Sequence, residues 1–309
     1  MHQSFDEPAP LAAPLDAYAP KEIAKRIQSG GVSKARLPLF SMATLAMLAG
    51  GFIGLGALYF TVVASDSSLS FAASRVLGGV AFSLGLILVV VGGAELFTGN
   101  NLLLMAWASR QISTRELLRN LAVTYVANFA GALGLVALVF LSGQWHLGGD
   151  GVGRQAVAIA ATKVSLPFWE ALFRGVLCNA LVCLAVWLAQ AGRSAADKIL
   201  AIVFPISAFV AAGFEHSVAN MYFIPLGILL RGRIQVGAVP HLDALTWAGL
   251  LHNLVPVTIG NLLGGGVMVA LVYYLVYLRP VPVEHAISAP GAMGVAAEDG
   301  QIGVPVPEH

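Results

Sequence analysis

Six long apolar segments, separated by short polar stretches, dominate the hydropathy pattern of the chain. They run over about 42–64, 76–108, 117–141, 169–190, 199–230 and 248–278. Roughly 20 residues of α-helix cross a hydrocarbon core of about 30 Å, so each segment is long enough to span a bilayer. The pattern predicts an all-α polytopic membrane protein whose six transmembrane helices form a membrane domain over 41–279.

The second and fifth segments are longer than one crossing requires. We therefore expect each helix to be broken, at 92–101 and at 213–220, where glycine interrupts the apolar run. Pro225 follows the second of these stretches, and we expect it to end the helix there. Irregular backbone at membrane depth is tolerated where it is buried in protein or lines a polar cavity, so both breaks mark a candidate site.

The two expected breaks share a motif, and so do the third and sixth segments. The matched pairs are Gly93-x-Glu95-x4-Asn100 with Gly213-x-Glu215-x4-Asn220, and Asn128-x-x-Gly131 with Asn261-x-x-Gly264. They indicate a duplication of three spans, with repeat one over about 41–141 and repeat two over about 169–279. Because three is an odd number of crossings, the halves must enter the membrane from opposite sides, as inverted repeats.

The two ends of the chain differ from the membrane domain in composition. Residues 1–40 are polar and punctuated by proline, and we expect a tail followed by a short interfacial helix over 20–28. Residues 280–309 are rich in Pro, Gly and Ala, which predicts a disordered tail. With both termini in the cytoplasm, eleven of the 17 Lys and Arg residues fall on that side and six on the other. The positive-inside rule favours this orientation.

Composition narrows the class of protein further. The chain is 58% hydrophobic and 11% charged, which is too apolar for a soluble domain, and its net charge of +1 gives no reason to expect a nucleic-acid partner. Cys178 and Cys183 lie in one apolar segment and predict neither a disulfide nor a metal site. The pattern indicates no cofactor.

Two acids and one histidine lie deep within the predicted spans. An ionisable residue at the bilayer centre costs about 3 kcal/mol, so each of them is a candidate functional group. Glu95 and Glu215 occupy equivalent points of the repeat, and we interpret them, with Asn220, as braces for backbone amides freed by the breaks. For His216 we favour a functional role, because its repeat counterpart is Leu96 and imidazole changes charge near neutral pH.

Other candidate residues have ordinary structural alternatives. Thr98 can hydrogen-bond its own helix, and Asn179 can hold two helices together. Phe82 and Phe209 can be core aromatic residues, and Lys163 can be a solvated charge that flanks a span.

Two other classes of protein stay open on these residues alone. One is a membrane-embedded hydrolase with Ser217 or Thr98 as nucleophile and His216 as base, although no spacing rule presents Ser217 to His216. The other is a pore for neutral solutes such as water or glycerol, which would leave an intramembrane histidine without a purpose.

The same residues resemble the signature loops of the formate/nitrite transporter family. The resemblance covers about 21–279, and within the family the chain looks most like the bacterial formate channels. It rests on Gly93-Ala94-Glu95-Leu96-Phe97-Thr98, on Gly213-Phe214-Glu215-His216-Ser217-Val218-Ala219-Asn220-Met221 and the following Tyr222-Phe223-Ile224-Pro225, on Lys163-Val164 and Asn179, on Gly192-Arg193-Ser194, and on Pro256-Val257-Thr258-Ile259-Gly260-Asn261.

This resemblance implies an aquaporin-like protomer of six spans in a bacterial inner membrane, assembled as a homopentamer with one pore per subunit. The pore would pass formate and related small monovalent anions, with nitrite, hydrosulfide or another short-chain monocarboxylate as the alternative substrate. Position by position, Thr98 and His216 would face each other at the pore centre near Asn179, and Lys163 would draw anions into the outer vestibule. The hydrophobic constrictions would be Phe82, Leu86, Leu96, Val182 and Phe209. On this reading we expect passage to be linked to protons and to depend on pH.

Overall fold

The computed structural model describes residues 16–279, which are helical with no β-strand in that range. The predicted disordered tail over 280–309 lies outside the described residues. Six helical spans are long and apolar enough to cross a membrane, so the predicted six-span fold is confirmed. They are α2 (Leu39–Ala64), α3 (Phe71–Gly92), α6 (Thr114–Ser142), α8 (Phe168–Ala191), α9 (Ala195–Ala212) and a composite span over Trp247–Tyr277.

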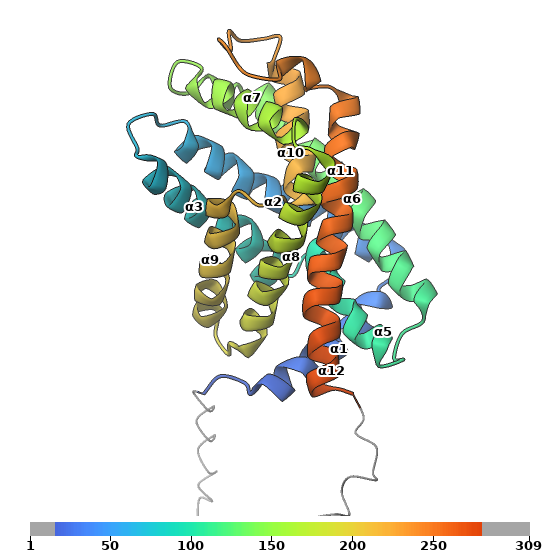
Figure 1. Cartoon of the computed structure of the whole chain (residues 1–309). Helices are drawn as coiled ribbons and strands as arrows, with labels where there is room; N and C mark the ends of the chain where they lie inside the picture. Colours follow the sequence, from blue (N-terminus) through green and yellow to red (C-terminus); the bar gives the residue numbers. More distant parts are fainter. Residues whose placement is uncertain (1–15, 280–309) are drawn as a thin grey trace, which may run out of the picture. The chain divides into compact units, whose positions relative to one another are not determined.

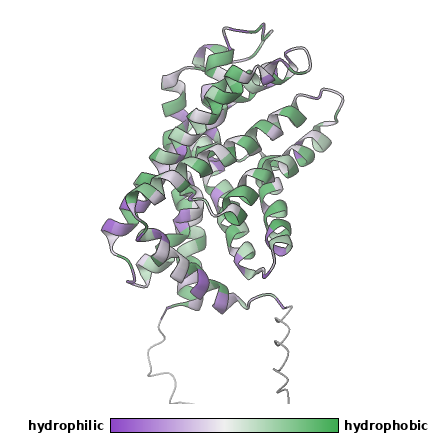
Figure 2. Ribbon diagram, turned by 180° about the vertical axis from the view of Figure 1, so that it is seen from behind, coloured by the Kyte–Doolittle hydropathy of each residue, from purple (hydrophilic) through white to green (hydrophobic). Residues whose placement is uncertain are grey.

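The composite span contains α11 (Trp247–Asn261), the π-helical stretch η4 (Leu262–Leu271) and α12 (Val272–Tyr277). Figure 2 shows hydrophobic residues over most of the helical body, with hydrophilic residues concentrated in α1 and in the connecting loops. This distribution is the one that a bilayer requires, because charged groups stay at the two polar faces.

Two shorter helices lie at opposite ends of the spans, where an inverted repeat would place them (Figure 1). One is α1 (Pro20–Ala35), which begins where the predicted interfacial helix does but continues beyond the predicted end at residue 28. The other is α7 (Gly151–Val164), which the sequence analysis missed because it is too short and too polar to stand out as a span. Each of these helices carries a lysine in its last turn.

Both long segments leave helical geometry near their middle. Gly93 and Gly213 adopt left-handed conformations, with φ of 80° and 75°, and end α3 and α9. Helix resumes as α4 (Phe97–Asn100), with η1 (Asn101–Leu103) and α5 (Leu104–Ala108) after it, and as α10 (Ser217–Leu230). The irregular stretches, 93–96 and 213–216, are therefore shorter than those expected.

The expectation that Pro225 ends a helix is wrong. Pro225 lies inside α10, which runs on to Leu230. A proline within a helix removes a single backbone hydrogen bond. Because most of α10 is buried among other helices, its packing holds the helix together across that gap.

A buried asparagine supports each break, and the two asparagines make the same bonds. The Asn128 Oδ1 accepts from the Phe97 backbone N–H at 2.9 Å, and its Nδ2 donates to the carbonyl oxygens of Ala46 at 2.7 Å and Glu95 at 2.9 Å. Asn261 repeats this pattern with Ser217 N–H at 2.9 Å and the carbonyl oxygens of Gly175 at 2.8 Å and Glu215 at 3.0 Å. Two of the three bonds on each asparagine satisfy backbone groups that the breaks leave without helical partners. The third, to Ala46 or Gly175, joins the break to a neighbouring span.

The glycine of the repeated Asn-x-x-Gly motif allows two spans to cross closely. A Cβ at Gly131 in α6 would overlap the Met47 carbonyl oxygen in α2, and a Cβ at Gly264 would overlap the Val176 carbonyl oxygen in α8. Such close approach of backbones is typical of helix pairs in membranes. In both halves, therefore, the asparagine of the motif supports a break and its glycine allows two helices to cross closely.

We predict that Gly131→Ala destabilises the protein by about 1–3 kcal/mol, the usual cost of overpacking, because its methyl group forces α2 and α6 apart. The measurement is the midpoint of thermal unfolding of the detergent-solubilised protein. Gly134→Ala on the same helix is the matched control, since a Cβ at Gly134 meets nothing within 4 Å. Equal midpoints for the two variants would show that the close crossing does not limit stability.

Candidate functional site

The two breaks meet at a contact between Thr98 and His216. Thr98 lies in the first turn of α4, and His216 is the residue that caps the start of α10. The Thr98 Oγ1 is 3.1 Å from the His216 Nε2, and both side chains are buried. The structure therefore brings together the two residues that were expected to face each other.

The hydrogen-bond partners of His216 assign its tautomer. Its Nδ1 accepts from the Ala219 backbone N–H at 3.0 Å, which is the capping bond of α10. A backbone N–H can only donate, so Nδ1 carries no proton and the proton of the neutral ring sits on Nε2. In this arrangement Nε2–H donates to the Thr98 hydroxyl oxygen. His216 is thus a hydrogen-bond donor to Thr98 and does not act as its base.

Asn179 lies behind Thr98 and contacts its carbonyl oxygen. The Asn179 Nδ2 donates to the Thr98 carbonyl at 3.3 Å and to the Asn261 carbonyl at 2.7 Å, which ties the first break to the last span. Asn101 Nδ2 at 3.0 Å and the Cys183 thiol at 3.4 Å donate to the same Thr98 oxygen. With so many donors, this carbonyl is held in one position. The sequence analysis did not foresee a polar contact for Cys183.

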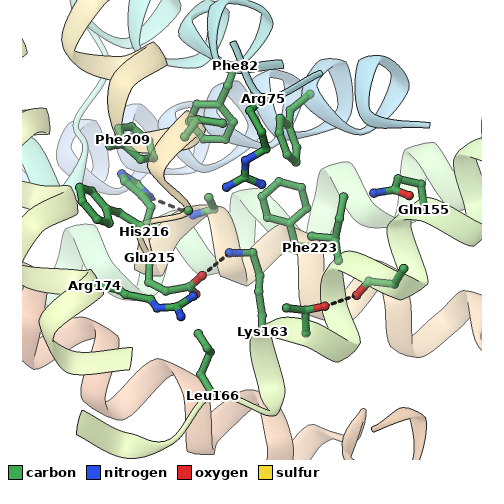
Figure 3. A pocket seen from close by; sticks show the side chains of 18 residues that line it. Arg75, Phe82, Gln155, Lys163, Leu166, Arg174, Phe209, Glu215, His216 and Phe223 are labelled. Carbon is green, nitrogen blue, oxygen red and sulfur yellow. Dashed lines mark hydrogen bonds and ion pairs between the residues drawn. The ribbon is translucent and has the colours of Figure 1, made fainter. Parts of the chain in front are cut away.

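A cavity of about 280 Å³ opens from the contact toward the α7 end (Figure 3). His216 lines it together with Phe82 and Phe209, whose ring centroids lie 5.5 Å apart in an edge-to-face arrangement. Its lining also carries three cationic side chains and one carboxylate: Arg75, Lys163, Arg174 and Glu215.

A second cavity of about 330 Å³ lies toward the α1 end. Leu86, Leu96 and Gly99, which follows Thr98 directly, are among its lining residues. Its charged lining residues are Arg26, Lys34 and Glu95. Of the predicted constriction residues, Val182 alone lines neither cavity, although it is buried. Both cavities hold more positive than negative groups, and a cationic cleft with low-dielectric walls raises the local concentration of anions.

Each buried glutamate pairs with a lysine from a short helix. The Lys163 Nζ lies 2.8 Å from Glu215 Oε1, and the Lys34 Nζ lies 2.9 Å from Glu95 Oε1. Asparagines donate to the other carboxylate oxygens, Asn220 to Glu215 at 2.7 Å and Asn100 to Glu95 at 2.8 Å. The expected bracing by Glu95, Glu215 and Asn220 thus has a counterpart in these contacts, whereas Lys163 is already occupied by a carboxylate.

Sequence reasoning missed Lys34, although the repeat contains a signal for it. Lys34-x-x-Leu37-Pro38 precedes α2, and Lys163-x-x-Leu166-Pro167 precedes α8 at the same spacing. Each motif places a lysine at the end of a short helix, just before a proline at the start of a span. The same order, one short helix followed by three spans, therefore occurs twice along the chain.

Comparisons with known proteins show the family of the chain. Residues 21–275 match the family model described as formate/nitrite transporter, so the chain belongs to the formate/nitrite transporter family. It is 40% identical over 277 residues to the formate channel FocA of Escherichia coli strain K12, an alignment that covers 86% of this chain and 96% of FocA. It is 41% identical over 262 residues to the uncharacterized transporter YrhG of Bacillus subtilis strain 168, covering 84% and 93%.

Solved structures show the same relationship. A pentameric formate channel with formate bound matches with a TM-score of 0.73 and 38% identity, covering 78% of this chain and 98% of that one. The protein is accordingly a membrane transporter and not an enzyme. The hydrolase alternative also conflicts with the tautomer of His216, whose Nε2 donates to Thr98 and whose Nδ1 binds a backbone amide in place of an orienting acid.

We predict that Lys163→Met destabilises the protein by about 3 kcal/mol, because it leaves the Glu215 carboxylate buried without its counter-charge. The double variant Lys163→Met/Glu215→Gln should recover most of that loss. Thermal unfolding of the solubilised protein measures both.

Lys34→Met is the matched variant at the other end. It should cost less, because the Lys34 side chain is 39% exposed against 14% for Lys163. If the double variant at Lys163 and Glu215 were no more stable than the single one, the ion pair would not be what holds Glu215 in place.

Proposed function

We propose that this protein is a channel for formate and related small monovalent anions. It would act as a homopentamer with one pore per subunit in the plasma membrane, with α1 and both termini on the cytoplasmic side. The observation that carries the proposal is the Thr98–His216 contact, which lies between two cavities that each hold excess positive charge. It is supported by relatives that are named formate channels and by the pentameric assembly of a solved relative.

The physical obstacle in such a pore is the charge of its substrate. Moving a small anion from water past apolar walls such as Phe82, Phe209, Leu86 and Leu96 costs several kcal/mol even after the protein relaxes. Protonation removes that cost. We propose that the cationic cavities concentrate the anion and that it crosses the centre as the neutral acid, so that passage is linked to a proton.

The hydrogen bonds of His216 favour water as the source of that proton. To give up a proton as an acid, His216 must first be doubly protonated, and a proton on Nδ1 would break its bond to the Ala219 amide. The neutral ring can instead hold the Thr98 hydroxyl in place through Nε2–H. Thr98 then presents a hydroxyl that can donate to the substrate between the two cavities.

A neutral-solute pore is disfavoured by the charged lining of the cavities. Water and glycerol gain nothing from three cationic side chains around one carboxylate, whereas an anion does. Nitrite, hydrosulfide and short-chain monocarboxylates are the expected further substrates of a pore of this kind.

Proteoliposomes test the proposal directly. We expect the reconstituted protein to take up labelled formate faster than protein-free liposomes do, and faster at about pH 5 than at about pH 7.5, where less of the neutral acid is available. Swelling in glycerol is measured on the same preparation. Glycerol permeation without formate uptake would refute the anion channel and support the neutral pore.

The role of His216 is tested by His216→Asn. Asparagine is a preferred capping residue, so α10 should keep its start and the protein should assemble, while the ring N–H that holds Thr98 is lost. We expect formate uptake to fall at both about pH 5 and about pH 7.5, because the histidine no longer holds the Thr98 hydroxyl in place.

Thr98→Val is the matched variant, since it keeps the shape of Thr98 and removes the hydroxyl. It should reproduce the loss if His216 acts through Thr98. A stable His216→Asn protein with unaltered uptake at both pH values would contradict the role assigned to the histidine.

A further inference from the structure

The free positive charge of the cavity at the α7 end is not on Lys163. The Lys163 ammonium forms an ion pair with Glu215 at 2.8 Å, which Figure 3 marks with a dashed line. A neutralised lysine contributes little net attraction for a second anion. The excess charge must therefore come from the two other cations of the lining, Arg75 and Arg174.

Arg75 is held in place without being neutralised. It lies near the start of α3, and its Nε donates to the Ala211 carbonyl oxygen at the end of α9 at 3.0 Å. Within residues 16–279 no carboxylate lies within ion-pair distance of it. The single bond to a carbonyl orients the guanidinium group and leaves its terminal nitrogens available.

The position of Arg75 places those nitrogens at the entrance to the second break. Its Nη2 would lie 2.8 Å from a Cβ at Gly213, so the group sits directly over the residue where α9 ends. In Figure 3 the guanidinium points into the cavity from the side of Phe82, with the Lys163–Glu215 pair below it. An anion bound there would be close to His216, which lines the same cavity.

Arg174 is the weaker candidate of the two. Its Nη2 pairs with Glu170 at 3.1 Å, and both side chains are well exposed, 40% for Arg174 and 56% for Glu170. An exposed pair of this kind is loosely held and largely screened by solvent. Arg174 adds positive potential to the cavity mouth, but Arg75 has the fixed geometry that a binding group needs.

Internal symmetry does not require an arginine at this position. The offset that relates Gly93 to Gly213 pairs Arg75 with Ala195, so the other half of the repeat has no equivalent group. At the α1 end the second cation, Arg26, stacks on the Tyr18 ring at 4.1 Å from its centroid. Like His216, Arg75 departs from the repeat, and such a departure points to function because the fold is built from the elements that the halves share.

We propose that Arg75 is the substrate-binding residue of this cavity and that it recognises small planar anions with two oxygens, the class that includes formate and nitrite. A guanidinium group offers parallel N–H donors that match two oxygens of one anion, whereas a spherical anion such as hydrosulfide engages it as a point charge. This inference rests on the proposed function and names the substrate class of that same pore.

Transport by matched variants tests the selectivity. Arg75→Lys keeps the charge and loses the pair of parallel N–H donors. The half-saturation concentrations for formate and nitrite should therefore rise about tenfold, the equivalent of about 1.4 kcal/mol. The half-saturation concentration for hydrosulfide should stay within about twofold of the wild-type value. Arg75→Gln should raise all three, because it removes the charge as well. Arg154→Gln removes a cation from α7 that does not line the cavity, and it should change none of them.

Binding is measured separately from transport, as the rise in unfolding temperature that formate produces in solubilised protein. We expect formate to stabilise the wild type and the Arg154→Gln variant and to stabilise Arg75→Gln much less. Equal stabilisation of wild type and Arg75→Gln, or an equal rise of all three half-saturation concentrations in Arg75→Lys, would overturn the inference. Stabilisation that depends on Arg75 in a protein that does not transport formate would instead refute the proposed function and leave the binding site standing.

Discussion

The whole arrangement depends on satisfying the backbone groups that two broken helices free within an apolar environment. A hydrogen-bonding group without a partner at membrane depth costs several kcal/mol, and the bilayer offers no water to replace the lost helical bond. Asn128 and Asn261 meet this requirement with two bonds each to the backbone of a break. The two breaks in turn place Thr98 and His216 in contact between the two cavities. The site is therefore a consequence of the same bonds that make the fold possible.

The buried glutamates also need partners, but what they require is a counter-charge and hydrogen-bond donors for a buried carboxylate. Glu95 and Glu215 accept hydrogen bonds from asparagines in α4 and α10 and pair with lysines that arrive from α1 and α7. Desolvated carboxylates are retained only where such partners surround them. Each short helix supplies the counter-charge for the break in its own half of the chain. The structure thus has a cavity with excess positive charge toward each end.

The residues that we propose to act on the substrate have no counterpart in the other half of the chain. Positions that the two halves share, such as the Asn-x-x-Gly motif, have roles in packing and in backbone support. When the two halves are aligned on Gly93 and Gly213, Leu96 stands at the position of His216 and Ala195 at the position of Arg75. His216 also caps α10, whereas Leu96 at the matched position gives α4 no side-chain cap. Both line the cavity at the α7 end.

The sequence by itself determined the six spans, the two breaks and the matched motifs, because hydropathy, segment length and glycine act locally along the chain. It also indicated that Glu95 and Glu215 act as braces, but not which lysines they bind. The Lys163–Glu215 pair joins residues 52 positions apart, and the Arg75–Ala211 bond joins residues 136 apart. Which side chains meet over such separations depends on how helices cross, and periodicity carries no information about that. The packing around α10 likewise decided that the helix continues past Pro225.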